Sequence, residues 1–447
     1  MNKFFLLLFA SALAFTALGQ KMDYIMSSPA AERYTHINKN GETIIPNGRI
    51  IAPAGRCFTV APHPYGLAIS RDGSVAVTAN SGTQPLAITI MRNLGSAEPD
   101  IQQVPPGAST DKGVLASVFM GLAVSPDNKV VYVAGGQENK VFIFDIATGA
   151  KLGAINCSSA DAGADYTHGY IGDMVLSSDG SRLYAVDQVG FRMLVIDPLS
   201  KKVLFNIPVG RYPFGIALSP GEETVYVANV GMYQYSLVKR KKKGEWKNGT
   251  LDFPAFAYQS KEAENGTYND SLQVPGLGNV NSDQSFSVWA ISVNGGTKPE
   301  VTARIKTGNL VGQMVEGIPA VGGSSPNSIV ASGSYVFISN GSNDNITVLD
   351  AANRSILKQI SLCPDDRIRK LRGIIPFGLA VSPDGKRVYL EKLPNSFCTS
   401  RNLLALFTAA ATFRRLRTMP GSFSSDAILF SSNLATFFGS KPANALR

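Results

Sequence analysis

The stretch PFGLAVSPDGKRVYL, residues 376–390, is one of six copies of a phrase in this chain of 447 residues. Its segment GLAVS is a run of small and β-branched residues, which is typical of a strand buried on both faces. The SPDG segment then supplies proline, aspartate and glycine where a tight turn requires them, and KRVYL returns as a second strand. The phrase therefore predicts an antiparallel hairpin.

The other five copies predict further hairpins of the same kind along the chain. Three of the copies continue into a third strand, a turn and a fourth strand. The continuations are residues 141–155, 193–210 and 346–362. Four antiparallel strands per unit, repeated every 40–50 residues or so, predict the blades of an all-β propeller. The five other copies are PYGLAISRDGSVAVTAN (64–80), GLAVSPDNKVVYVAGG (121–136), GDMVLSSDGSRLYAVD (172–187), PFGIALSPGEETVYVAN (213–229) and PNSIVASGSYVFISN (326–340).

Composition agrees with a protein of strands and turns. Charged residues make up only 17% of the chain, beside 43 glycines and 25 prolines. The net charge of +9 is local, because KRKKK (239–243) carries +5 and the stretch from Glu391 onward carries another +5, which leaves −1 for all other residues. No basic face is spread over the repeats, so we expect no nucleic-acid partner.

The N-terminus has the order of a secretory signal peptide. Lys3 precedes an apolar stretch from Phe4 to Leu18, and the small residues around Gly19 suit cleavage. We expect residues 1–19 to be removed, an N-terminal arm over residues 20–48, and export to the periplasm, the cell surface or the medium. No other run is long enough to span a membrane as a helix, so the mature chain should contain no transmembrane segment.

The phrases resemble a known family. VYVAN, the SPDG turn and the third strands such as MLVID are similar to the YVTN-type β-propeller repeat, over residues 49–390. The resemblance implies a ring that is usually seven-bladed, in exported bacterial and archaeal proteins, with the GLAVS strand innermost and lining a central channel. Six repeats are recognisable here, and the last is incomplete. Some relatives continue into a phosphoesterase domain that resembles alkaline phosphatases, and nothing after Leu390 resembles it.

Two segments interrupt or extend the repeats. GRCFTVAPHPYG (55–66) looks like an orphan strand that completes the last blade, as in closed propellers. Residues 239–284 are polar, rich in glycine and asparagine, and predict a long loop inserted into one blade. Long loops on a rigid scaffold often carry function, although a solvated decoration is at least as common.

Polar side chains in the loops that lead into the inner strands are the candidates for a binding site at the mouth of the channel. Two of the three histidines lie there and could bind a metal or act as bases, but only Asp173 offers an obvious third ligand. Hydrogen bonding to loop backbones is the better explanation of the histidines, because no matched set of ligands accompanies them, so we expect no metal and no cofactor. The candidates are His63, Tyr65, His168, Tyr170, Asp173, Arg211, Tyr212 and Asn327.

No catalytic motif accompanies these residues. The four cysteines show no CxxC spacing, and the chain has no P-loop, GxSxG or HExxH sequence. The aspartates after each inner strand have the position expected of turn residues. We therefore expect a binding scaffold for an unknown protein, glycan or small molecule. The alternatives are a lactonase-like hydrolase sited in the channel and the non-catalytic propeller of a truncated two-domain phosphoesterase.

The character of the sequence changes within the sixth copy. After Leu390 a polar turn and a third strand should follow, but acidic residues nearly vanish and arginines cluster at 414, 415 and 417. The change falls inside a pair of strands, where no domain boundary belongs. We expect residues 391–447 to be an atypical tail, shifted in reading frame or disordered. A basic amphipathic helix at a membrane surface is the alternative.

Overall fold

The computed structural model describes residues 28–38, 41–52, 56–81, 86–106, 115, 117–158, 160–161, 164–249, 260–294, 297–363, 374–392, 407–408, 429–431 and 434–437. Backbone contacts divide the chain into two units, residues 1–52 with 399–402 and residues 53–398 with 403–447. In the first unit, β1 (Thr43–Ile44) pairs with β2 (Ile50–Ile51).

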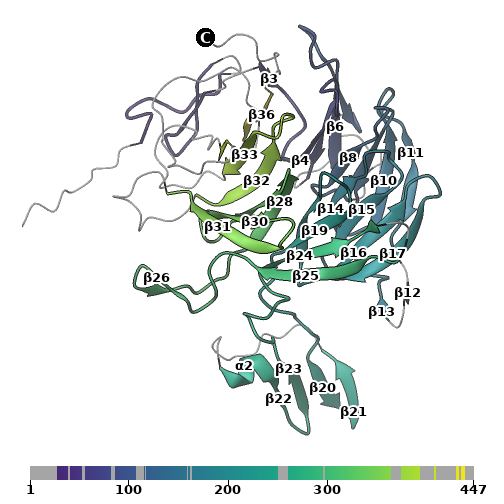
Figure 1. Ribbon diagram of the computed structural model, residues 1–447, viewed down its shortest axis with the longest axis vertical. Helices are drawn as coiled ribbons and strands as arrows, with labels where there is room; N and C mark the ends of the chain where they lie inside the picture. Colours follow the sequence, from purple (N-terminus) through teal and green to yellow (C-terminus); the bar gives the residue numbers. More distant parts are fainter. Residues whose placement is uncertain are drawn as a thin grey trace, which may run out of the picture. The chain divides into compact units, whose positions relative to one another are not determined.

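The second unit is an all-β propeller, with five four-stranded antiparallel blades in chain order (Figure 1). Blade 1 contains β4 (Pro64–Ile69), β5 (Ala76–Asn80), β6 (Ala87–Arg92) and β7 (Asp100–Val104). Blade 2 contains β8 (Leu122–Val124), β9 (Val130–Ala134), β10 (Lys140–Asp145) and β11 (Lys151–Asn156). Blade 3 contains β14 (Ile171–Leu176), β15 (Leu183–Asp187), β16 (Arg192–Asp197) and β17 (Lys202–Pro208). Blade 4 contains β18 (Pro213–Leu218), β19 (Thr224–Asn229), β24 (Ser287–Ser292) and β25 (Glu300–Lys306). Blade 5 contains β28 (Pro326–Ser332), β29 (Tyr335–Asn340), β30 (Asn345–Asp350) and β31 (Ser355–Ser361).

Two further sheets of this unit have three strands each. Blade 6 contains β32 (Pro376–Val381), β33 (Arg387–Lys392) and β34 (Phe407–Thr408). The seventh sheet has the order β3 (Arg56–Phe58), β36 (Leu434–Phe437) and β35 (Leu429–Ser431). The N-terminal strand β3 therefore pairs with a strand from the other end of the chain.

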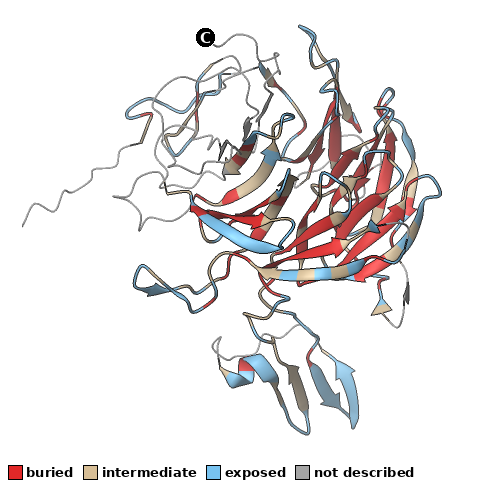
Figure 2. Ribbon diagram, viewed as in Figure 1, coloured by how far each residue is buried: buried red, intermediate tan, exposed pale blue. Residues whose placement is uncertain are grey.

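Burial follows the position of each strand in its blade. In the five four-stranded blades the second and third strands are buried nearly throughout, whereas no residue of the fourth strand β25 is buried and the fourth strand β31 is largely exposed (Figure 2). The runs of valine, isoleucine and alanine in VYVAN-type segments suit positions that are covered on both faces. This pattern confirms the all-β propeller that the sequence predicts.

The blades are held together by apolar cores between their faces. Five core clusters each join two consecutive blades, from blades 1 and 2 to blades 5 and 6. In the first cluster, for example, Ile88 of blade 1 packs with Val133 and Phe144 of blade 2, and all three are fully buried. Complete burial of such a side chain contributes about 1.5–3 kcal/mol.

The glycine that begins GLAVS is required by the close approach of neighbouring inner strands. A Cβ atom at Gly66 would lie 1.8 Å from the backbone oxygen of Met120 in the next blade. At Gly215 it would lie 2.8 Å from the backbone oxygen of Asn327. A side chain at these positions would force the inner strands apart.

The turn after the inner strand is held by a serine and an aspartate. In four blades the serine hydroxyl donates to the aspartate two residues later, at 2.6 Å for Ser70 and Asp72 and at 2.5 Å for Ser382 and Asp384. The hydrogen bond from Ser70 is the main reason that the pKa of Asp72 falls to about 2. These aspartates therefore stabilise turns, as the sequence pattern predicts.

The segment between β19 and β24 forms a four-stranded sheet of its own, which we call the insertion sheet. Its order is β21 (Glu245–Asn248), β20 (Lys239–Lys242), β23 (Leu272–Pro275) and β22 (Gly266–Tyr268), with the short helix α2 (Lys261–Asn265) preceding β22. Ser260 caps this helix by accepting the N–H of Ala263 at 3.1 Å. Among the residues that the structure describes, no helix has both the length and the apolar character needed to cross a lipid bilayer.

Candidate functional site

Five aromatic side chains lie at the end of the channel where the inner strands begin. We call this the mouth end, and the group the aromatic cluster. Each blade except blade 5 contributes one ring, from the second residue of the inner strand or from the loop just before it. The members are Tyr65, Phe119, Tyr170, Phe214 and Phe377.

The aromatic cluster reaches across the channel. Phe119 of blade 2 meets Phe214 of blade 4 edge to face, with ring centroids 6.0 Å apart, and Phe214 meets Phe377 of blade 6 at 5.9 Å. Tyr65 completes the circle with centroid distances of 5.9 Å to Phe119 and 6.0 Å to Phe377. The pairs Phe119–Phe214, Phe214–Phe377 and Tyr65–Phe377 join blades that are not neighbours, so the rings meet across the mouth end of the channel.

Asp173 lies on the inner strand of blade 3 near this cluster. It occupies the position where four other blades have glycine, and its carboxylate accepts the backbone N–H of Met174 at 2.8 Å and that of Ile216 in blade 4 at 3.4 Å. Burial raises the pKa of Asp173 to about 7, although the two N–H groups act in the opposite direction. A carboxyl with this pKa can exchange a proton near neutral pH.

Of the predicted candidates, Tyr65 and Tyr170 belong to the aromatic cluster, and none of the others forms a hydrogen bond with the Asp173 carboxylate among the described residues. Asn327 joins blades 5 and 6, because its amide donates to the backbone oxygen of Pro376 at 3.0 Å and accepts from the Ser339 hydroxyl at 2.6 Å. His63 and His168 are exposed. Tyr212 has a φ of 48° and meets Phe191 edge to face at 4.8 Å.

Arg211 serves as an anchor for the segment that contains the insertion sheet. Its guanidinium is buried and donates to the backbone oxygens of Met232 at 2.7 Å and Asn279 at 3.3 Å, and to the Ser285 hydroxyl at 2.9 Å. Lys306 donates to the backbone oxygen of Ser282 at 3.0 Å, and burial together with the nearby Arg211 charge lowers its pKa to about 8. Both cations thus bind backbone carbonyls where the chain leaves and rejoins blade 4.

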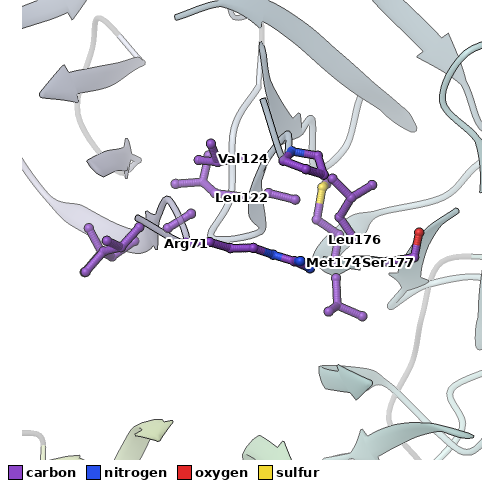
Figure 3. Close-up of a pocket in the computed structure, with 12 residues that line it drawn as sticks. Arg71, Leu122, Val124, Met174, Leu176 and Ser177 are labelled. Carbon is purple, nitrogen blue, oxygen red and sulfur yellow. The ribbon is translucent and has the colours of Figure 1, made fainter. Parts of the chain in front are cut away.

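A cavity of about 280 Å³ lies at the opposite end of the channel, where the inner strands finish, and we call this the turn end. Blades 1, 2 and 3 line it with mainly apolar side chains, including Leu122, Val124 and Met174. Figure 3 shows the Arg71 side chain extending toward Met174 and Leu176 at this cavity. Apolar side chains beside one guanidinium suit a small organic anion.

Arg71 departs from the repeat at this point. It follows the serine of the turn, where Pro126, Pro220 and Pro383 stand in blades 2, 4 and 6. An arginine at a position where other blades have proline was therefore the signal in the sequence that could have identified this residue. The phenylalanines at 119, 214 and 377 were not predicted as site residues, because their side chains have no group that forms a conventional hydrogen bond.

Groups of three or more histidine, cysteine, aspartate or glutamate side chains that could hold a metal ion do not occur within the described part of the chain. Of the three predicted ligands, His63 precedes β4 of blade 1, whereas His168 and Asp173 belong to blade 3.

Comparisons with known proteins describe the fold only. No family model matches the chain, and no curated protein matches it. The chain is similar to the solved structure of a functionally unknown protein from Desulfotomaculum acetoxidans, with 13% identity and a TM-score of 0.44 over 75% of this chain and 81% of that one. It is also similar to the periplasmic gluconolactonase of Pseudomonas aeruginosa, with 14% identity and a TM-score of 0.46 over 78% of this chain and 83% of that one.

A third similar structure is the β-propeller domain of Cps50 from Myceliophteria thermophila, with 11% identity and a TM-score of 0.38 over 76% of this chain and 96% of that one. Identities and TM-scores this low leave the fold assignment to the blades described above. Those blades show that the chain is an all-β propeller.

Proposed function

We propose that the chain is an exported β-propeller of the YVTN type and that its ring acts as a binding scaffold. The leader-like N-terminus and the six repeat phrases support export and the family. The aromatic rings that meet across the mouth end and the cavity at the turn end support binding at the turn end of the channel.

The observation that carries the proposal is Arg71 at the cavity. A guanidinium beside apolar side chains suits a small ligand with an apolar body and one anionic group, which would lie against Leu122, Val124 and Met174. The cavity volume of about 280 Å³ suits a compact molecule rather than a polymer.

A titration with 1-anilinonaphthalene-8-sulfonate tests this proposal, since the probe combines an aromatic body with one sulfonate and its fluorescence reports binding. Arg71→Gln should weaken the affinity about tenfold or more, because a hydrogen bond to a charged group contributes about 1.5–3 kcal/mol. Arg354→Gln removes an exposed arginine from the outer turn of blade 5 and serves as the matched control. Equal affinity of the native protein and Arg71→Gln would refute the site.

Asp173 favours a second candidate, a hydrolase in the channel. A general base with a pKa near 7 is suited to activating water for attack on a lactone. This function predicts lactone hydrolysis that increases with pH around 7 and is lost in Asp173→Asn. Lactone hydrolysis that is absent from the native protein, or is unchanged in the variant, would exclude this candidate.

A further inference from the structure

The insertion sheet presents a face with a composition different from that of the ring. Its two strands β20 and β21 are exposed at every residue, and β20 carries four of the five cations of the KRKKK segment. Figure 2 shows both strands as exposed surface. Such a concentration of charge and exposed strand contributes little to a core, so its side chains are available to a partner.

The strand register decides which side chains share a face. Residues that pair directly across antiparallel strands point to the same side of the sheet. Lys241 pairs with Trp246, Lys239 pairs with both Asn248 and Gln273, and Gln273 pairs with Tyr268. We call the face that these side chains form the stacking face; its members are Lys239, Lys241, Trp246, Asn248, Tyr268 and Gln273.

The opposite face of the same sheet provides an internal comparison. By the same alternation it carries Arg240, Lys242, Glu245 and Lys247, and Lys247 lies 3.8 Å from the Glu245 carboxylate. It has several charges but no exposed aromatic ring on these two strands. The two faces therefore resemble each other in cations and differ in aromatic and amide groups.

The stacking face has two aromatic platforms with polar groups between them. Trp246 is 40% exposed and Tyr268 is 63% exposed, and they lie on the two outermost strands of the sheet. Three strand spacings of about 4.8 Å and an offset of two residues along the strands put the two positions roughly 16 Å apart. The Lys241 ammonium is 6.0 Å from the centre of the Trp246 ring. None of the ion pairs between described residues includes Lys239 or Lys241.

We propose that the stacking face binds an acidic polysaccharide, with pyranose rings on Trp246 and Tyr268 and carboxylates or sulfates on Lys239 and Lys241. The charges are complementary, and the amides of Asn248 and Gln273 can donate to and accept from sugar hydroxyls. A lipid surface is less suited, because the hairpin tip carries Lys243, Gly244 and Glu245 instead of apolar residues. The choice of a glycan over a nucleic acid rests on the proposed export.

Tryptophan fluorescence gives a direct readout of this binding. The chain has two tryptophans, and Trp289 is buried with only 4% exposure. Trp289→Phe therefore leaves Trp246 as the single reporter on the stacking face. Titration with oligogalacturonate at physiological ionic strength should change its fluorescence saturably, whereas a neutral gluco-oligosaccharide of the same length should have no effect.

Matched variants, whose binding is measured by calorimetry, locate the site. Trp246→Ala should weaken oligogalacturonate binding about tenfold, and Lys239→Gln with Lys241→Gln should weaken it by a similar factor. Lys242→Gln with Lys247→Gln removes the same charge from the opposite face and should leave the affinity unchanged. All these side chains are exposed, so far-ultraviolet circular dichroism should confirm that each variant folds.

Three outcomes would overturn the proposal. If both pairs of lysine substitutions weakened binding equally, the sheet would attract polyanions in general and not bind them on the stacking face. Preferential binding of single-stranded DNA or of phosphatidylglycerol vesicles would assign another partner class. No binding of oligogalacturonate would remove the site altogether. Because the variants of the stacking face leave Arg71 unchanged, none of these outcomes affects the test of the cavity in the ring.

Discussion

Arg192 and Asp187 form an ion pair whose side chains are both fully buried in blade 3. The guanidinium donates to the Asp187 carboxylate at 2.9 Å, to the Asn206 amide oxygen at 2.6 Å and to the backbone oxygen of Cys157 in blade 2 at 2.8 Å. It also lies 4.0 Å from the centre of the Tyr166 ring. This network links two blades with polar groups that are largely satisfied.

Removing one partner should therefore be costly. We expect Asp187→Ala to lower the free energy of unfolding by about 3–5 kcal/mol, because the Arg192 charge would remain buried without its partner. Urea unfolding measures the change. Lys129→Ala, which breaks the exposed pair with Asp127, should cost less than about 1 kcal/mol. If Asp187→Ala were as mild as this control, the buried pair would not have the role assigned here.

Asp173 predicts a pH dependence of stability. Its pKa is about 7 in the folded protein and 3.8 ordinarily, so between these values the folded state holds a proton that the unfolded state has released. The contribution is therefore present at low pH and is lost as the pH rises from about 4 to 7. Burial raises the pKa of Glu391 to about 7, which adds a contribution in the same direction.

We expect Asp173→Asn to gain stability relative to the native protein between pH 5 and pH 8, as measured by urea midpoints. Asp179→Asn is the control, because the hydrogen bond from Ser177 lowers the pKa of Asp179 to about 2 and keeps this carboxylate ionised over the same range. A constant difference between Asp173→Asn and the native protein would contradict the raised pKa.

At the scale of the element, one substitution in the turn of blade 1 should have opposite effects on stability and on binding. Arg71 occupies the turn position that is favourable for proline, and its N–H donates none of the backbone hydrogen bonds found among the described residues. We expect Arg71→Pro to raise the free energy of unfolding by about 0.4–1 kcal/mol, because proline restricts the unfolded chain. The same variant should lose binding of the sulfonate probe. Loss of stability together with binding would show that arginine stands there for structural reasons.

The strands could be predicted from the sequence where burial imposes a pattern. The phrase from Pro376 to Leu390 predicts the hairpin of β32 and β33, and the aspartate that ends the third strand at Asp350 accepts the N–H of Ala352 at 2.8 Å as a turn residue. The insertion sheet was predicted as a loop, because KRKK and EWKN are exposed throughout and show no alternation of apolar residues.

The candidate site was only partly predictable for a related reason. Asp173, Tyr65 and Tyr170 were predicted because they are polar residues of the segments that lead into the inner strands. The contacts of Phe119 with rings from three blades depend on the closure of the ring, which one phrase does not encode. Arg211 was expected at the channel mouth, but its length carries the guanidinium to the carbonyls of Met232 and Asn279.

At the scale of the whole molecule, blade 6 departs from blades 1, 3, 4 and 5 at one residue pair. The second strands of blades 1, 3, 4 and 5 end in a buried asparagine or aspartate that follows a small or apolar residue, whereas β33 ends with Glu391 and Lys392. The change of reading frame after Leu390 stays a prediction. The residues Glu391 and Lys392, where blade 6 departs from the repeat, come directly after Leu390.

Sequencing of the gene across codons 388–392 and downstream checks it. We expect a second frame that restores a small residue, an asparagine or aspartate, and a third strand, and that continues into a phosphoesterase domain if the chain is one half of such a protein. An intact frame that encodes the same tail would contradict the prediction.

The most direct test of the binding scaffold is a crystal structure of the protein with 4-bromobenzoate, whose bromine can be located by anomalous scattering. The account predicts one bromine peak in the cavity between β4, β8 and β14, with the carboxylate within hydrogen-bonding distance of Arg71. A cavity without a peak at saturating ligand, or a peak among Tyr65, Phe119 and Phe377 at the mouth end instead, would contradict it.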